Sequence, residues 1–349
     1  MEMIPKEVFK VLREKLGAGF DDFVLEKIVL IVGDTACENL RIEDSDLRDG
    51  LWREVDIIVN TAAAIKFDER YDVALGTNTI GAKNVLHFAK KYLKLQNLVH
   101  VSTVSTETLN GTLDLDIVHE HKVVRETLDD LRSQGVTKEF ERTAMKELGL
   151  QRARQYGWPN TYAFTKAMGE MLIGLLRGDL PVTILRPSII TSTIREPFPG
   201  WTEGIRYLIG YGKGKIPCFL ADPALVIDLI PGDMVANAMV VASVLHANQP
   251  SQYICHVLQL LNAVFCQYWQ GLFKDLKGKI KLVLRLGELY EPYIFFEGVF
   301  DDSKSEKMRL KLSTRNLEAD TFCFDPNCID WDDYMVNIHL PGVVRHNLK

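Results

Sequence analysis

Short apolar runs bounded by turn residues alternate with segments of helical periodicity along the first half of the chain. The apolar runs are 27–32, 56–60, 98–102 and 182–186. Continuous runs of this length, rich in Val, Ile and Leu, are typical of strands buried on both faces of a parallel sheet. Between them, residues 81–93 and 162–176 place apolar side chains on one face of a helix. The alternation predicts a doubly wound α/β fold with a Rossmann-like parallel sheet.

Two regions depart from this alternation. Residues 122–156 form a charged stretch of helical pattern, which we interpret as an insertion over the carboxyl edge of the sheet. After about Pro250 the pattern changes to helical segments that contain Tyr, Trp and Phe. We therefore predict a Rossmann-like domain over residues 1–250 and a smaller, mainly helical C-terminal domain over residues 251–349.

The composition narrows the class of protein. A chain of 349 residues, 47% of them hydrophobic and 25% charged, suits a globular protein of one large domain or two unequal ones. The net charge of -6 gives no basic footprint, so nucleic acid is not an expected partner. No apolar run reaches the roughly 18 residues that a membrane span needs, and residues 1–7 are unlike a secretory signal.

The cysteines and histidines point to neither a disulfide framework nor a metal site. Six cysteines are scattered without a C-x-x-C pair, which favours reduced thiols in an intracellular compartment. His119 and His121 flank Glu120 in a polar stretch, but no third ligand is evident in the sequence. We expect an intracellular protein, in the cytosol or at the surface of the endoplasmic reticulum, with no bound metal.

The candidate chemistry lies at Tyr162-Ala-Phe-Thr-Lys166, where a tyrosine and a lysine stand one helical turn apart. Residues at i and i+4 share a helix face. The Lys166 ammonium would therefore favour the Tyr162 phenolate and lower the phenol pKa from about 10 toward neutrality. A phenol tuned in this way can exchange a proton with a carbonyl oxygen while a hydride moves at carbon. The same spacing also occurs on ordinary surface helices. The neighbouring segments must therefore show whether Tyr162 and Lys166 are a catalytic pair.

Other polar segments follow the predicted strands. Residues 60–63 end one strand, Ser102 and Thr103 end the next, and residues 187–188 follow the strand after the helix that Tyr162 opens. In an open parallel sheet, ligands bind beyond the carboxyl ends of the strands, so these segments converge on one edge. The arrangement resembles the extended short-chain dehydrogenase/reductases, in which a Ser or Thr, the Tyr and the Lys form the catalytic triad.

Separate motifs narrow the resemblance to the plant fatty acyl-CoA reductases. They are residues 67–75, 78–81, 162–170, 186–188, 197–201, 289–293 and 329–334. The resemblance covers most of the chain. It implies NADPH-dependent reduction of a long-chain fatty acyl-CoA to a primary alcohol, through an aldehyde, in two hydride transfers.

The resemblance also implies roles for individual residues. Tyr162 would be the proton donor, and Lys166 would lower its pKa and bond the nicotinamide ribose. The cofactor-binding residues would be Asp34, Asn60, Ala62, Ala63, Asn78, Lys166, Pro187 and Ser188. Asn78 could equally be a polar group at a helix N-terminus, and Pro187 could equally be a strand terminator. For Asp34, a turn residue after Gly33 is the better interpretation.

The sequence departs from this family at three places, one of which is the region 253–282, which matches the family poorly and looks shortened. The family begins with a strand and a T-G-x-x-G-x-x-G turn that holds the pyrophosphate, and this chain has no such motif. The run 27–32 would then be the third strand of the fold, with the first two strands missing. A doublet, V-S-T-V-S-T over 101–106, leaves two candidates for the catalytic hydroxyl. We favour Thr103 over Thr106, because the apolar run before Thr103 fixes its depth at the strand end.

Two competing hypotheses remain. Reduction of a hydroxysteroid or a dihydroflavonol on the same scaffold fits the C-terminal motifs less well. A weakly active or inactive remnant of the family could instead bind lipid or a partner protein. Peripheral association with a membrane, and self-association through an exposed sheet edge, are open at this point.

Overall fold

The computed structural model describes residues 4, 6–103, 116–203, 228–247, 253–258, 301–314 and 321–347. The chain divides into two compact units. One unit comprises Val32–Arg186 and Ala242–His256 and is called the sheet unit here. The second unit comprises Met1–Ile31, Pro187–Val241 and Val257–Lys349. The domain boundary predicted near residue 250 stays a prediction.

The central sheet contains the strands that the apolar runs predict. Its order is β1-β2-β3-β6, made of β1 (Ile57–Asn60), β2 (Asn97–Val101), β3 (Val182–Pro187) and β6 (Tyr253–Leu258). The β1–β2 and β2–β3 pairs are parallel, with Asn60 opposite His100 and His100 opposite Ile184. The predicted α/β class with a parallel sheet is confirmed.

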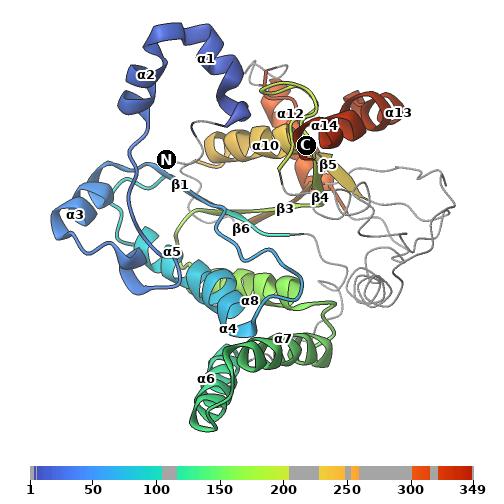
Figure 1. Cartoon of the computed structure of the whole chain (residues 1–349). Coiled ribbons are helices and arrows are strands. Elements are labelled where there is room, and N and C mark those ends of the chain that lie inside the picture. The colour runs from blue at the N-terminus through green and yellow to red at the C-terminus, as the bar shows by residue number, and fades with distance from the viewer. Residues whose placement is uncertain are drawn as a thin grey trace, which may run out of the picture. The chain divides into compact units, whose positions relative to one another are not determined.

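Helices cover one face of this sheet. The helical elements of the sheet unit are η3 (Glu38–Arg41), α3 (Ser45–Glu54), α4 (Tyr71–Ala74), η4 (Leu75–Ile80), α5 (Gly81–Ala89), α6 (Ile117–Ser133), α7 (Lys138–Gln155) and α8 (Thr161–Leu176). Helices α5 and α8 lie side by side against the sheet (Figure 1). Their apolar stripes meet inward-facing strand residues in one core, in which Leu86, Leu98, Ile173 and Ile184 are almost fully buried. This core fixes the depth of α8 relative to the ends of β2 and β3.

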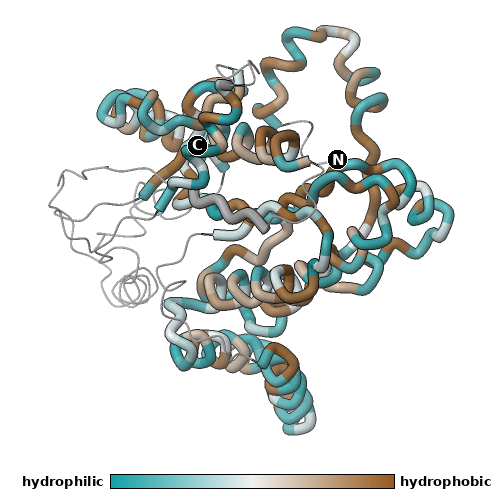
Figure 2. The backbone as a smooth tube through the Cα atoms, turned by 180° about the vertical axis from the view of Figure 1, so that it is seen from behind, coloured by the Kyte–Doolittle hydropathy of each residue, from teal (hydrophilic) through white to brown (hydrophobic). Residues whose placement is uncertain are grey.

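The charged stretch after β2 forms a second helical layer. Helix α6 begins after Asp116, whose carboxylate accepts the amides of Val118 and His119, and α7 begins after Thr137. Figure 2 shows that this helix pair is largely hydrophilic. Its few apolar residues pack with α4 and α8 in a separate core that includes Tyr71, Met145 and Phe164. The predicted helical insertion is therefore two helices that support the outer side of α8.

The second unit contains a small parallel strand pair and helices from both ends of the chain. Its elements are η1 (Glu7–Phe9), α1 (Lys10–Leu16), η2 (Gly17–Gly19), α2 (Phe20–Lys27), β4 (Ile189–Thr191), β5 (Leu229–Pro231), α10 (Gly232–Leu245, whose last turn counts with the sheet unit), α12 (Ser303–Thr314), η5 (Pro326–Cys328), α13 (Trp331–Asp333), η6 (Tyr334–His339) and α14 (Leu340–Asn347). The Tyr334 hydroxyl donates to the Ser192 carbonyl (2.6 Å) and contacts Thr191 Oγ1 (2.7 Å). The segment between the motifs 186–188 and 197–201 is thereby joined to the motif 329–334.

One predicted strand is wrong. The run 27–32 is not a strand, because α2 ends at Lys27 and the residues after it pair with no other strand among those described. Val29 is 78% exposed and Val32 is 93% exposed. Apolar residues form a strand only where a neighbouring backbone satisfies their N–H and C=O groups. Strand β1 is therefore the edge of the described sheet, and Ile57 and Val59 on it are partly exposed.

Candidate active site

The first turn of α8 carries the tyrosine, and its second turn carries the lysine. The helix starts where the Asn160 side chain accepts the amide of Ala163 at 2.9 Å. Lys166 is only 2% exposed, and its ammonium donates to the carbonyl of Val101 at the end of β2 over 2.8 Å. Burial lowers the pKa of Lys166 to about 8, and the charge of Glu170 opposes that lowering. Lys166 is therefore a mostly charged group at neutral pH, packed against the end of β2.

The tyrosine differs from the sequence-based expectation. Burial raises the pKa of Tyr162 above its usual value, and a side-chain hydrogen bond with Thr103 offsets part of that rise. The predicted lowering toward neutrality is therefore not found, because burial outweighs the hydrogen bond with Thr103. The Tyr162 ring stacks on Phe67 with ring centroids 5.9 Å apart. Tyr162 is thus a neutral phenol at pH 7, the protonation state that a proton donor needs.

Thr103 completes a group of three side chains at the strand end. It lies two residues after the end of β2 and forms a side-chain hydrogen bond with Tyr162, while the choice between Thr103 and Thr106 stays a prediction. Thr106 lies outside the described residues, as does the motif at 289–293. Thr103, Tyr162 and Lys166 therefore converge as the resemblance implies, while their catalytic roles stay predictions.

Next to them is a buried pair of Asn60, a predicted cofactor residue, and His100, which the sequence reasoning missed. The Asn60 amide nitrogen lies 3.1 Å from His100 Nδ1, and the Asn60 side-chain oxygen accepts the amide of Ala62 at 3.2 Å. His100 is 1% exposed, and its Nε2 has no hydrogen-bond partner among the described residues. Burial, and secondarily the charge of Lys166, lower the pKa of His100 to about 3, so it is neutral. The available signal was a histidine at an inward position of an otherwise apolar strand.

Asn78 links the loop after β1 to α8. It lies inside a π-type turn in the middle of a helix, a feature frequent at functional sites, and so not at a helix N-terminus. Its amide donates to Thr165 Oγ1 (2.9 Å) and to the Ala64 carbonyl (3.1 Å), while its oxygen accepts the Ala64 amide (2.8 Å). Gly169 allows the close approach, because a Cβ there would lie 2.3 Å from the Asn78 carbonyl oxygen.

The remaining predicted cofactor residues occupy separate positions. Asp34 is an exposed turn residue: its carbonyl accepts the Cys37 amide (3.1 Å) and its carboxylate accepts the Ala36 amide (2.9 Å). This confirms the turn interpretation, and Asp34 also lines a hollow of about 510 Å³. The other residues that line it are Val32, Gly33, Arg41 and Glu43.

Three further predicted residues lie beside the ends of β1 and β3. Pro187 is the last residue of β3 and is buried, and Ser188 follows it. Ala63 is half-buried in the loop after β1. No group of His, Cys, Asp and Glu suited to a metal occurs in the described part of the chain.

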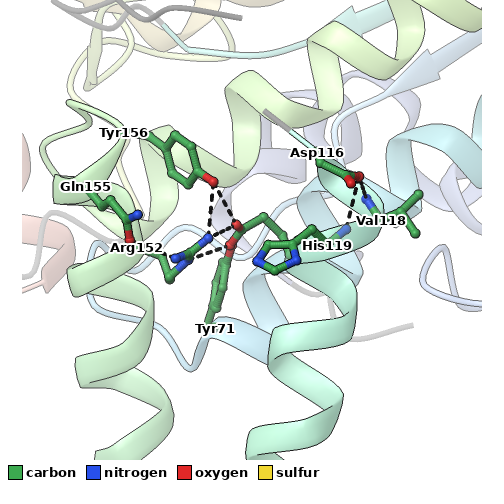
Figure 3. Close-up of polar contacts among 8 residues, drawn as sticks. Tyr71, Asp116, Val118, His119, Arg152, Gln155 and Tyr156 are labelled. Atoms are coloured by element: carbon green, nitrogen blue, oxygen red, sulfur yellow. Dashed lines mark hydrogen bonds and ion pairs between the residues drawn. The ribbon is translucent and has the colours of Figure 1, made fainter. Parts of the chain in front are cut away.

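A buried ionic cluster joins α4, α6 and α7 next to α8 (Figure 3). The fully buried Glu120 carboxylate accepts from Tyr71 (2.6 Å), from Arg152 Nε (3.0 Å) and from Tyr156 (3.3 Å). The rings of Tyr71 and Tyr156 also stack on Phe164 of α8. The cluster therefore ties α4, α6 and α7 to the helix that carries Tyr162.

The residues present fit one end of a nicotinamide dinucleotide. The buried Lys166 ammonium has a single acceptor among the described residues, so two of its N–H groups are available to ribose hydroxyls. By contrast, the sequence offers no glycine-rich turn for the pyrophosphate.

A parallel sheet with Thr103, Tyr162 and Lys166 near the carboxyl end of β2 is the arrangement implied by the resemblance to the short-chain dehydrogenase/reductases. Comparisons with known proteins agree. Residues 2–239 match an NAD-binding family and residues 253–349 match the Sterile family, both described as Male sterility protein. A nicotinamide cofactor is therefore the cofactor class of this fold.

The chain is 42% identical to an alcohol-forming fatty acyl-CoA reductase of Simmondsia chinensis, across 100% of its own length and 88% of that relative. It is equally 42% identical, with the same coverage, to a probable fatty acyl-CoA reductase 4 of Arabidopsis thaliana. The chain belongs to the fatty acyl-CoA reductase (male sterility protein) family.

Among solved structures, the terminal R domain of the myxalamid biosynthetic pathway shares the fold. Its TM-score is 0.56 at 18% identity, over 94% of this chain and 78% of that domain. Within the part of the chain that the structure describes, no helix has the length and apolar character of a membrane span.

Proposed function

We propose that this chain reduces a long-chain fatty acyl-CoA to the primary alcohol with NADPH, through an aldehyde. The observation that carries the proposal is the convergence of Thr103, Tyr162 and the buried Lys166 at the end of β2. Family membership and the names of the relatives support the substrate class.

In this proposal the bound nicotinamide supplies the hydride, and the protein supplies the proton and its control. Tyr162 is neutral and gives its phenolic proton to the oxygen that becomes an alkoxide after hydride arrives at the carbonyl carbon. Thr103 hydrogen-bonds the same oxygen and the phenol. Lys166 holds the ribose with its free N–H groups, and its charge stabilises the phenolate left behind.

Two rounds of this chemistry balance the reaction. In the first, the thioester carbon gains a hydride, the C–S bond breaks and coenzyme A leaves as the thiol, so that an aldehyde forms. In the second, the aldehyde carbon gains a hydride and its oxygen takes the proton from Tyr162. Each round consumes one NADPH and one proton.

The choice of NADPH over NADH rests on the resemblance and on one residue. Arg41 is the basic side chain among those that line the hollow at Asp34. An arginine near the adenine ribose is the usual partner of the 2′-phosphate that distinguishes NADPH.

The test is NADPH consumption with a long-chain acyl-CoA, compared between the wild type and Tyr162→Phe. The phenylalanine keeps the stacking on Phe67 and removes only the hydroxyl, so the rate should fall by about 10²–10⁴. A Tyr162→Phe variant with more than half of the wild-type turnover would remove the proton donor from this account.

A second candidate, a lipid-binding remnant with feeble activity, has one observation in its favour: the sequence lacks a glycine-rich pyrophosphate turn. The two functions separate in one experiment. A remnant binds the acyl-CoA in equilibrium dialysis and consumes no NADPH, even at millimolar cofactor.

A further inference from the structure

An ion pair lies one turn beyond Lys166 on α8. Glu170 is 6% exposed, and both of its carboxylate oxygens accept from Arg186 Nε, at 3.1 and 3.0 Å. Arg186 Nη2 also contacts Glu170, so the guanidinium is held along the plane of the carboxylate. Arg186 is the residue before Pro187 at the end of β3. The pair therefore joins the helix that carries the active-site residues to the third strand.

Glu170 is also the acidic residue of the site that acts on Lys166. The two residues are four apart, so their side chains share one face of α8. Among the residues that the structure describes, the titratable groups near Lys166 include Tyr162, a neutral phenol on the same helix, and His100, a neutral imidazole on β2. On β3, Arg186 adds a second cation whose charge Glu170 also balances. Without the carboxylate, the groups named here around the buried ammonium would be neutral or, in Arg186, positively charged.

We propose that Glu170, fixed by Arg186, is a positioning residue that keeps Lys166 charged and aimed at the end of β2. The inference rests on the proposed function, in which the Lys166 charge stabilises the Tyr162 phenolate. Burial lowers the pKa of Lys166 and so favours its neutral form. The charge of the Glu170 carboxylate opposes this lowering. Arg186 in turn donates to both carboxylate oxygens of Glu170 from β3.

The two partners have opposite electrostatic effects on the lysine. Glu170→Gln keeps the shape and one acceptor for Arg186 but removes the negative charge. The pKa of Lys166 should then fall by about one pH unit or more, because an opposite charge nearby is lost. Arg186→Met removes a positive charge and leaves Glu170 with Lys166 as its cation, so the pKa of Lys166 should stay level or rise. If the Glu170–Arg186 pair acted only by holding α8 against β3, the two substitutions would change the Lys166 pKa in the same direction.

The experiment measures the lysine directly, without turnover. Protein labelled with ¹³C at lysine Cε is titrated by NMR, and the Lys166 signal is assigned by its loss in Lys166→Met. The wild-type midpoint should lie at about 8. Glu170→Gln should move it to lower pH, Glu170→Asp should restore it, and Arg186→Met should not lower it. Glu126→Gln, which removes an exposed carboxylate of α6, is the matched control and should leave the midpoint unchanged.

Two results would overturn the inference. One is a Lys166 midpoint in Glu170→Gln that equals the wild type. The other is an equal fall in both Glu170→Gln and Arg186→Met, which would show that the pair acts through packing alone. Because the titration needs no substrate, an inactive protein would count against the proposed function and would leave this test intact. In an active protein, the pH above which the reduction rate falls should be lower in Glu170→Gln than in the wild type, and it should not be lower in Arg186→Met.

Discussion

Arg152→Met should lower the stability of α6 and α7, the two helices that pack beside α8. Arg152 is 13% exposed at its side chain and pairs with Glu120, which is fully buried. Truncating the arginine leaves a buried carboxylate without its cation, and breaking such a pair costs about 3–5 kcal/mol. The hydroxyls of Tyr71 and Tyr156 still donate to Glu120 after the change, so we expect the lower end, about 3 kcal/mol.

Hydrogen exchange of the α6 and α7 amides is the suitable assay, because a chain with two units need not unfold in one step. A loss of about 3 kcal/mol corresponds to roughly a hundredfold faster exchange in these helices. The matched control is Glu126→Gln, which breaks an exposed pair with Lys122 on the same helix. That pair is worth about 0.3–0.5 kcal/mol, or roughly a twofold effect.

The cluster also predicts a dependence on pH. Burial raises the pKa of Glu120, but the hydrogen bonds from Arg152 and Tyr71 outweigh this, and the net pKa lies below its usual value. A carboxyl with a lowered folded-state pKa contributes its stability above the unfolded value of about 4.3, and that contribution is lost as the pH falls through the folded-state pKa. Exchange in α6 and α7 should therefore accelerate under acid conditions in the wild type, with a smaller change in Arg152→Met. Exchange in Arg152→Met within about threefold of the wild type at pH 7 would refute the reasoning, because it corresponds to under about 1 kcal/mol.

Further predictions concern the site itself. Thr103→Ala should lower turnover far more than it changes the melting temperature, and unchanged turnover would shift attention to Thr106. The reduction rate should fall as the pH rises through about 8, where Lys166 loses its charge. The residual rate of Lys166→Met should not show this fall. Arg41→Ala should raise the KM for NADPH but not for NADH, and equal effects on both cofactors would exclude Arg41 as the 2′-phosphate contact.

The periodicity of the sequence was sufficient for the strands that have neighbours. Residues 56–60, 98–102 and 182–186 each became β1, β2 or β3 within a residue or two. The run 27–32 has the same composition and failed, because periodicity reports burial and says nothing about a pairing partner. The site followed from the strand ends, since parallel strands bring their carboxyl ends to one edge.

The electrostatics of the site could not be read from spacing alone. The i and i+4 positions of Tyr162 and Lys166 suggested a lowered phenol pKa, yet burial raises it. Spacing fixes which face two residues share, whereas the pKa of Tyr162 depends on its burial and on its hydrogen bond with Thr103. The contacts of His100 and Arg186 also depend on how strands and helices pack, which no single segment encodes.

The most direct test of the central claim follows the hydride itself. The purified protein is incubated with a long-chain acyl-CoA and millimolar NADPH that carries deuterium at the transferred position of C4, and the lipid product is analysed by mass spectrometry. The account predicts a primary alcohol with two deuterium atoms at C1, formed by the wild type and lost in Tyr162→Phe. An alcohol without deuterium, or no reduced product from a folded protein that binds both ligands, would contradict it.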